Sequence, residues 1–301
     1  MRLTPSKEGN KSPMATPCTA LLFPGQGSQT DDMRADVEQH RPDLIELAEQ
    51  EVGEDPFARV EENTRFAQPA LFCASLAGLS RLEGLEPEFY AGHSMGEIAA
   101  LVAAESLSTE DGLRIVALRG RVMDEAAADA PDSGMLALRG DLELAQQLAD
   151  RHGLTVANDN APGQVVLSGH EEGLEAATSE AEEEGARTTR LPVAGGFHSP
   201  AIESAVPEFE QALAEIEFAS PRAPVFSGVT AEPFDDPARQ LVQSLTSPVR
   251  WREILLALHE RGARRFVETG PGKVLTGLVK RTLDDVEAVT ADALDEDAAR
   301  A

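Results

Sequence analysis

The sequence contains little cysteine, few aromatic side chains, few lysines and no long apolar run. Its two cysteines, Cys18 and Cys73, lack the spacing of metal ligands, and isolated cysteines are usually buried and reduced. No stretch of about eighteen consecutive apolar residues occurs, so no membrane-spanning helix is predicted. Residues 1–17 lack the apolar core of a secretory signal, and we expect a disordered extension there. These absences predict a cytoplasmic protein with no metal site and no membrane contact.

The charge is strongly one-sided. Asp and Glu number 53 against 26 Lys and Arg, which gives a formal net charge of −27, and only 4 of the basic residues are lysines. An acidic, lysine-poor surface is typical of adaptation to high salt, where the self-repulsion of such a charge is screened over short distances. The alternative is an acidic cytosolic protein from a GC-rich genome. In both cases the charge argues against nucleic acid as a partner.

One segment of the chain has a net positive charge, in contrast to the whole. Residues 250–281 contain eight basic and three acidic residues. A locally basic face on an acidic protein suggests docking of an acidic partner. The alternative is that these residues pair with acidic groups elsewhere in the fold. The basic residues of this window are Arg250, Arg252, Arg261, Arg264, Arg265, Lys273, Lys280 and Arg281.

Residues 89–101 have the order of a nucleophile elbow, in which a strand, a sharp turn and a helix follow one another. A short apolar run ends in Gly-His-Ser-Met-Gly, and an alanine-rich helical pattern follows. Gly92 and Gly96 lack a Cβ, so strand and helix can approach closely on either side of Ser94. The pattern favours Ser94 as a nucleophile at a helix N-terminus. The alternative for the pentapeptide alone is an ordinary tight turn.

A second loop follows an earlier strand. Residues 19–23 form an apolar run that predicts a buried strand, and residues 24–29 read Pro-Gly-Gln-Gly-Ser-Gln. The alternative is a plain connection between a strand and a helix. Folds with a nucleophile elbow take one oxyanion N–H from such a loop and the other from the residue after the nucleophile, which predicts an oxyanion hole here.

Two charged or titratable residues complete the candidate site. Arg119 lies on an apolar helix face, and its charge needs a partner, which is either a structural ion pair or a substrate carboxylate. His198 lies in a glycine-rich loop just before a helix. A loop histidine is usually just solvated, but this one is a general-base candidate because Ser94 has no other obvious partner.

The order of predicted elements changes in the middle of the chain. Residues 31–86 are mostly helical in pattern, and a β-α-β-β-α-β order, typical of a ferredoxin-like domain, occupies residues 134–193. We therefore expect an α/β fold, with an α/β-hydrolase-like catalytic domain made of residues 18–130 and 199–290. Residues 131–198 form an inserted small domain in this interpretation. An acidic tail, frayed from Asp284 onward, covers residues 291–301.

Seven motifs in one order resemble the malonyl-coenzyme A:acyl carrier protein transacylase family and the acyltransferase domains of polyketide and fatty-acid synthases. One such match is weak, but seven in register over nearly the whole chain after residue 18 are specific. The motifs are FPGQGSQ at 23–29, GHSMGE at 92–97, ALRG at 117–120, NDNAPGQVVLSG at 158–169, GFHSP at 196–200, SPVRW at 247–251 and ETGPGKVLTGL at 268–278.

The resemblance implies a ping-pong acyl transfer without a cofactor. Ser94 would be the nucleophile and His198 its base, held by a backbone carbonyl near Arg250. Arg119 would bind the malonyl carboxylate as a two-pronged fork. The backbone N–H groups of Gln26 and Met95 would form the oxyanion hole.

The resemblance also bears on specificity and partners. His93 and Phe197 would line the substrate pocket, and the bulk of Phe197 favours malonyl over methylmalonyl. The implied partners are malonyl-coenzyme A and acyl carrier protein, and we expect a monomer. Because the carrier protein is acidic in this family, Arg264, Arg265, Lys273 and Lys280 are candidates for its docking face.

Alternatives to this assignment belong to two other classes. A serine hydrolase such as a thioesterase would use the same elbow with a carboxylate triad partner, and would have no use for Arg119. A non-catalytic scaffolding domain could lose any of Ser94, His198 and Arg119, and all three are present.

Overall fold

The structure is a computed structural model that describes residues 17–300. The predicted extension, residues 1–17, therefore lies outside the described residues except for its last position. A five-stranded sheet and a four-stranded sheet organise the described chain. None of the helices between residues 17 and 300 is long and apolar enough to cross a membrane.

The larger sheet is parallel throughout. Its strand order is β7 (Val225–Phe226), β2 (Phe89–Gly92), β1 (Thr19–Phe23), β8 (Arg265–Glu268) and β9 (Glu287–Thr290). Phe23 lies beside Gly92, and Leu22 lies beside Glu268. The loops that follow β1, β2 and β8 consequently leave the sheet at the same edge. Open parallel sheets bind ligands at this carboxyl edge.

Strand β1 shows why this sheet needs helices on both faces. Successive side chains of a strand point to opposite faces. Leu21 and Phe23 belong to a core shared with the helices α3, α4 and α5, whereas Ala20 and Leu22 belong to a second core shared with α10 and α11. The covering helices are α3 (Thr64–Ser80), α4 (Gly96–Ala103), α5 (Thr109–Asp129), α10 (Trp251–Glu260) and α11 (Val274–Thr282).

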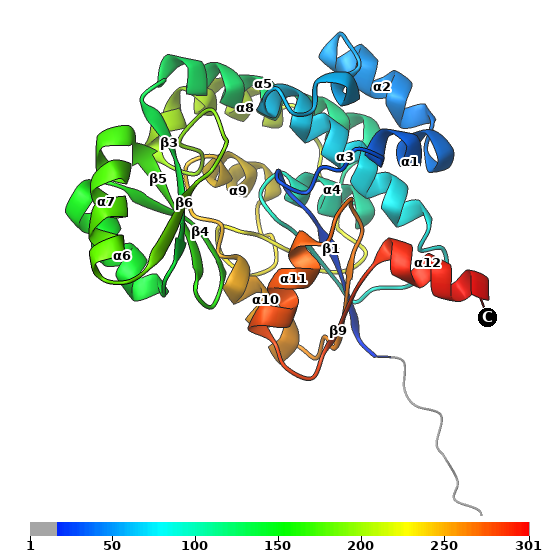
Figure 1. Ribbon diagram of the computed structural model, residues 1–301. Helices are drawn as coiled ribbons and strands as arrows, with labels where there is room; N and C mark the ends of the chain where they lie inside the picture. The colour runs from blue at the N-terminus through cyan, green and yellow to red at the C-terminus, as the bar shows by residue number, and fades with distance from the viewer. Residues whose placement is uncertain (1–16, 301) are drawn as a thin grey trace, which may run out of the picture.

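The remaining helices surround these layers (Figure 1). The predicted helical character of residues 31–86 is confirmed by α1, α2 and α3. The outer helices are α1 (Met33–His40), α2 (Asp43–Val52), α8 (Val206–Leu213) and α9 (Pro237–Ser244), with short 3₁₀ turns at Pro56–Arg59 and Pro200–Ala205.

The smaller sheet belongs to one continuous insertion, drawn in green in Figure 1. Its elements follow the predicted β-α-β-β-α-β order, and its strands pair antiparallel in the order β4-β5-β3-β6. The last strand ends at residue 190 rather than at the predicted residue 193, because Pro192 has no N–H to donate to the ladder. The elements are β3 (Ser133–Arg139), α6 (Leu142–His152), β4 (Thr155–Ala161), β5 (Gln164–His170), α7 (Glu171–Glu183) and β6 (Arg187–Arg190).

The prediction of a frayed acidic tail is wrong for the described residues. Strand β9 extends the parallel sheet, and α12 (Ala291–Arg300) follows it and packs against α3. Arg81 of the segment after α3 pairs with Asp292 at 2.6 Å. The acidic composition of this segment led to the wrong prediction. Two of its small apolar residues, Ala288 and Ala291, are buried.

Candidate active site

The turn after β2 holds Ser94 in an unusual backbone conformation. Its φ is 54°, in the left-handed region that non-glycine residues rarely adopt. The predicted need for glycine on both sides is confirmed. A Cβ at Gly92 would lie 2.0 Å from the carbonyl carbon of Gly96, and a Cβ at Gly96 would lie 2.2 Å from the carbonyl oxygen of Phe23. Strand and helix are therefore close enough to aim the serine hydroxyl at the carboxyl edge of the sheet.

His198, which is distant from Ser94 in the sequence, lies next to it in the structure. Ser94 Oγ lies 2.9 Å from His198 Nε2, and His198 Nδ1 lies 2.7 Å from the carbonyl oxygen of Ser244. A carbonyl only accepts hydrogen bonds, so Nδ1 carries the proton and Nε2 is left to accept the serine hydroxyl proton. The geometry is that of a serine with an oriented base.

The prediction that a carbonyl near Arg250 orients this histidine is wrong in position. The carbonyl of Arg250 accepts the N–H of Ile254 in the first turn of α10, and its side chain pairs with Glu253. Ser244 is the last residue of α9, and the final carbonyls of a helix lack intrahelical partners. That free helix end, rather than the segment before α10, supplies the acceptor.

The environment keeps His198 neutral. Burial and, second to it, the positive charge of Arg119 together lower its pKa to about 3, while the bond to Ser244 opposes the shift. The imidazole is consequently a free base over the whole physiological pH range.

Arg119 is 1% exposed and lies beside the nucleophile. Its Nη1 donates to Gln68 Oε1 at 2.8 Å, and its Nη2 donates to Ser94 Oγ at 3.2 Å. Among the side chains of residues 17–295, no carboxylate forms an ion pair with this guanidinium, although Glu97 is near enough to act on it through charge. Burial lowers its pKa to about 10, so the group stays charged at neutral pH. A buried cation without an ion-pair partner is suited to binding an anionic ligand.

The backbone donors expected for an oxyanion hole are also present. Gln26 lies in the loop after β1, and Met95 precedes the first residue of α4. Within the described part of the chain, the backbone N–H of neither residue donates to a protein acceptor. Both groups are free to bind a developing negative charge near Ser94.

The cavity around these residues has a volume of about 390 Å³. The predicted pocket residues His93 and Phe197 both line it. His93 Nε2 lies 2.8 Å from Asn160 Oδ1 of β4, which ties the elbow to the smaller sheet. Asp159 points away from the cavity and pairs with Arg252 at 2.8 Å, so its carboxylate does not face an anionic substrate.

Sequence reasoning missed two residues of the site, Thr64 and Gln68. Both lie on α3, line the same cavity and are 2% exposed. Gln68 holds the guanidinium of Arg119, and Thr64 Oγ1 donates to Gln26 Oε1 at 2.8 Å. The available signal was a polar residue in the otherwise apolar run of α3, where a buried amide needs partners.

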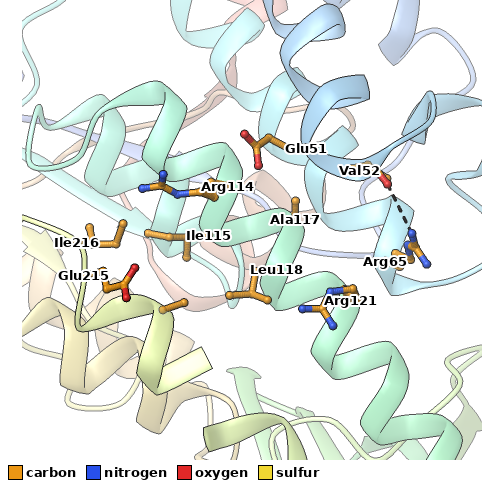
Figure 2. Close-up of a pocket in the computed structure, with 11 residues that line it drawn as sticks. Glu51, Val52, Arg65, Arg114, Ile115, Ala117, Leu118, Arg121, Glu215 and Ile216 are labelled. Carbon is orange, nitrogen blue, oxygen red and sulfur yellow. Dashed lines mark hydrogen bonds between the residues drawn. The ribbon is translucent and has the colours of Figure 1, made fainter. Parts of the chain in front are cut away.

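A larger cavity of about 580 Å³ lies on the outer face of α5, between α2 and the end of α8 (Figure 2). None of the described residues that line it is a serine, cysteine or histidine. Arg114 pairs with Asp111, and Arg121 pairs with Glu125 and Glu208, so these two basic groups already have partners. The cavity beside Ser94 is therefore the candidate active site.

The basic window of residues 250–281 does not form one face. Arg264 and Arg265 lie at the start of β8, at the edge of the sheet opposite to Ser94, and Arg265 pairs with Glu287 at 2.6 Å. Lys273 and Lys280 are exposed at the start and on the last turn of α11. Leu275 and Leu278 of the same helix line the active-site cavity, and Arg281 in its last turn donates to Oε1 of Gln164, another lining residue, at 3.1 Å.

The sequence matches a known family over most of its length. A model of the acyl transferase domain matches residues 46–296. The chain is 37% identical over 297 residues to the malonyl CoA-acyl carrier protein transacylase of Synechocystis sp., which covers 92% of this chain and 98% of that protein. It is 41% identical over 281 residues to the polyketide biosynthesis protein ThaF of Burkholderia thailandensis, of whose length it spans 24%.

Solved structures give the same result. The malonyl-CoA:acyl carrier protein transacylase of Xanthomonas oryzae superimposes with a TM-score of 0.87 at 33% identity, over 95% of this chain and 98% of that one. A malonyl-transacylase in complex with its holo type II polyketide synthase acyl-carrier protein superimposes with a TM-score of 0.81 at 33% identity, over 91% and 94%.

Proposed function

The chain belongs to the acyl transferase domain family, and we propose that it moves malonyl from malonyl-coenzyme A to the phosphopantetheine thiol of an acyl carrier protein. It is a malonyl-coenzyme A:acyl carrier protein transacylase of fatty-acid or polyketide synthesis. The observation that carries this assignment is the contact of Ser94 with both His198 and Arg119, at 2.9 and 3.2 Å. A nucleophile, its base and a cation for the substrate carboxylate meet at one oxygen.

The first half-reaction forms a malonyl-serine. His198 Nε2 takes the hydroxyl proton of Ser94 as Oγ attacks the thioester carbonyl carbon. The N–H groups of Gln26 and Met95 bind the carbonyl oxygen as it becomes negative, where loss of one donor typically costs roughly 3 kcal/mol. The tetrahedral intermediate collapses, the C–S bond breaks, and the coenzyme A thiolate leaves with the proton from His198.

The second half-reaction uses the same groups in reverse order. The thiol of the carrier protein gives its proton to His198, its sulfur attacks the ester carbonyl, and Ser94 leaves as the alcohol. Arg119 holds the malonyl carboxylate throughout. An acetyl group would leave this buried cation unpaired, which is the basis for selectivity against uncharged acyl groups. None of these steps requires a metal or a further cofactor.

The bulk of Phe197 supports selectivity for malonyl over methylmalonyl. The residue is 6% exposed and lines the cavity, where its ring would crowd an α-methyl branch. Phe197→Ser should admit methylmalonyl-coenzyme A as an acyl donor. A variant that stays selective for malonyl would remove Phe197 from this role.

The two sheets support a finer description of the fold. The parallel sheet with its elbow is consistent with an α/β-hydrolase-like domain, made of residues 18–130 and 199–290. The β-α-β-β-α-β insertion with strand order β4-β5-β3-β6 is consistent with a ferredoxin-like domain, residues 131–198. We propose both domain assignments, and we propose that the protein is a cytoplasmic monomer adapted to high salt. Activity that rises between low and molar KCl would support the last of these, and activity that falls steadily would contradict it.

The exposed side of α11 is the surface we assign to carrier-protein docking. Lys273 and Lys280 lie on the helix whose Leu275 and Leu278 line the cavity, and Val274, 44% exposed, adds an apolar contact beside them. Lys280→Glu should raise the KM for carrier protein severalfold and leave that for malonyl-coenzyme A unchanged. The double variant of Arg264 and Arg265 to Glu, at the opposite edge of the sheet, is the control. Equal rises in both KM values for Lys280→Glu would contradict docking.

Intact-protein mass spectrometry tests the activity itself. After brief incubation with malonyl-coenzyme A, we expect one malonyl adduct, absent in Ser94→Ala. In Arg119→Ala the preference should relax towards acetyl-coenzyme A. Continuous release of coenzyme A without an acceptor and without an adduct would instead indicate a hydrolase.

A further inference from the structure

A line of hydrogen bonds joins the oxyanion loop to the carboxylate-binding arginine. Arg119 Nη1 donates to Gln68 Oε1 at 2.8 Å, and Gln68 Nε2 donates to Thr64 Oγ1 at 2.9 Å. Thr64 Oγ1 in turn donates to Gln26 Oε1 at 2.8 Å. All three bonds run in one direction, from the guanidinium to the loop. The two functions of the site are thus connected through α3.

Burial makes this line rigid. Thr64 and Gln68 are 2% exposed and Arg119 is 1% exposed, so water cannot readily replace a lost partner. Gln26, in contrast, is exposed on its loop. Within the described residues, its bond to Thr64 is the only hydrogen bond between a side chain of that loop and a side chain of α3. Gln68 Nε2 also contacts Met123 Sδ at 3.4 Å, which fixes the amide further.

We propose that Thr64 is a positioning residue that couples the oxyanion loop at Gln26 to the carboxylate fork at Arg119. The inference rests on the proposed function. The Thr64 hydroxyl bonds to both Gln68 and Gln26. The position of Arg119 on a malonyl carboxylate therefore fixes the position of the Gln26 N–H relative to the thioester oxygen. A malonyl group seated on the fork therefore meets an oxyanion hole already aligned.

The chemistry of the hydroxyl explains why this position needs Thr or Ser. A hydroxyl accepts one hydrogen bond and donates another at the same atom. Valine has nearly the same shape but neither capacity, and would leave Gln68 Nε2 with only the weak sulfur acceptor of Met123 and Gln26 Oε1 without its partner on α3. Thr64 is the first residue of α3, where substitution disturbs no intrahelical bond of its own N–H.

Acylation rates measured by rapid quench and intact mass test the coupling. The full-length wild type, Thr64→Val and Thr64→Ser are each mixed with malonyl- and acetyl-coenzyme A, and Thr64→Ala repeats the hydroxyl deletion without the β-branch. In Thr64→Val we expect acylation by malonyl to slow about a hundredfold and by acetyl about tenfold, since one net hydrogen bond is worth about tenfold or less and each function loses one. Thr64→Ser should stay within about threefold of wild type for both donors.

The malonyl-to-acetyl ratio distinguishes coupling from a purely structural role of Thr64. A fall in this ratio in both hydroxyl-deleted variants, at unchanged melting temperature and with rescue by serine, supports the coupling. Equal slowing of both donors, or a wild-type ratio in Thr64→Val and Thr64→Ala, overturns it. A wild-type protein that forms no malonyl adduct refutes the proposed function instead, so the two failures are distinguishable.

Discussion

Glu97 is an ionisable group that the proposed chemistry does not use, and its burial has a consequence for stability. It lies in the first turn of α4 and is 1% exposed, and its Oε1 accepts the backbone N–H of Gly228 at 2.6 Å. Burial raises its pKa to about 7, against the opposing effects of the Gly228 bond and the charge of Arg119. The folded protein therefore holds this proton more tightly than the unfolded chain.

The sign and size of the effect follow from proton linkage. Below the unfolded pKa of 4.5, the carboxyl is protonated in both states and adds no difference. As the pH rises through the folded pKa, the folded state must bear a buried charge, and stability is lost. Between those two pKa values the loss amounts to roughly 3 kcal/mol. Glu97→Gln keeps the acceptor for Gly228 and removes the charge, so it should be more stable than wild type at pH 8 and equal to it near pH 4.5.

Thermal unfolding of both proteins at the two pH values measures this difference. For a chain of this size, roughly 3 kcal/mol corresponds to a rise of about 6 °C in melting temperature at pH 8. The pKa of His198 is lowered in the folded state, so the fold is destabilised as the pH falls below 6.5. This effect is the same in wild type and Glu97→Gln, so it cancels in the difference between them. Glu260→Gln, on the exposed side of α10, is the matched control. An equal gain at both pH values, or a loss at pH 8, would refute the reasoning.

Three further predictions, which use four substitutions, test the site and the turn that holds it. Arg119→Met should raise the pKa of His198, because the positive charge is the second cause of its depression after burial, and an NMR titration of the imidazole that shows no rise would contradict this. Arg250→Ala should leave the acylation rate within about threefold of wild type, because Ser244 supplies the carbonyl to His198, and a loss of a hundredfold would return the orienting role to Arg250. Gly92→Ala should lower the free energy of unfolding, measured in urea, by more than about 3 kcal/mol, because its Cβ would overlap the backbone of Gly96. The control is Gly277→Ala in α11, where the space around the Cβ is open and the substitution should stabilise the fold by roughly 0.5–1 kcal/mol. Similar effects of the two substitutions would contradict the argument.

Local order was the predictable part of this molecule. The strands before the two glycine-rich loops are recognisable because both faces of the sheet are covered, so their sequences are apolar without interruption. Residues 19–23 were predicted with the bounds of β1. The helix α5 starts where Ser108 caps it, and Ser108 Oγ accepts the N–H of Asp111, a bond typical of serine at this position. In each case the signal and the structure that it specifies lie within a few residues.

The orientation of His198 could not be predicted in the same way. Its acceptor, the carbonyl of Ser244, is a backbone group, and every residue has one. What singles out Ser244 is that α9 ends there and that the end faces the histidine, which depends on packing between distant segments. The motif around Arg250 is nearby in sequence, but its carbonyl is already used by α10.

The basic window fails as a single docking surface for a related reason. Charges that cluster in the sequence need not cluster in space when a strand lies between them. Strand β8 runs from Arg265 at one edge of the sheet to Glu268 at the other, and it separates the arginines before it from the lysines after it. Lys273 and Lys280 lie instead at the start and on the last turn of α11, the helix whose Leu275 and Leu278 line the cavity beside Ser94. If docking occurs at α11 as proposed, the affinity for the carrier protein should depend on Lys273 and Lys280 and not on the total positive charge of the window.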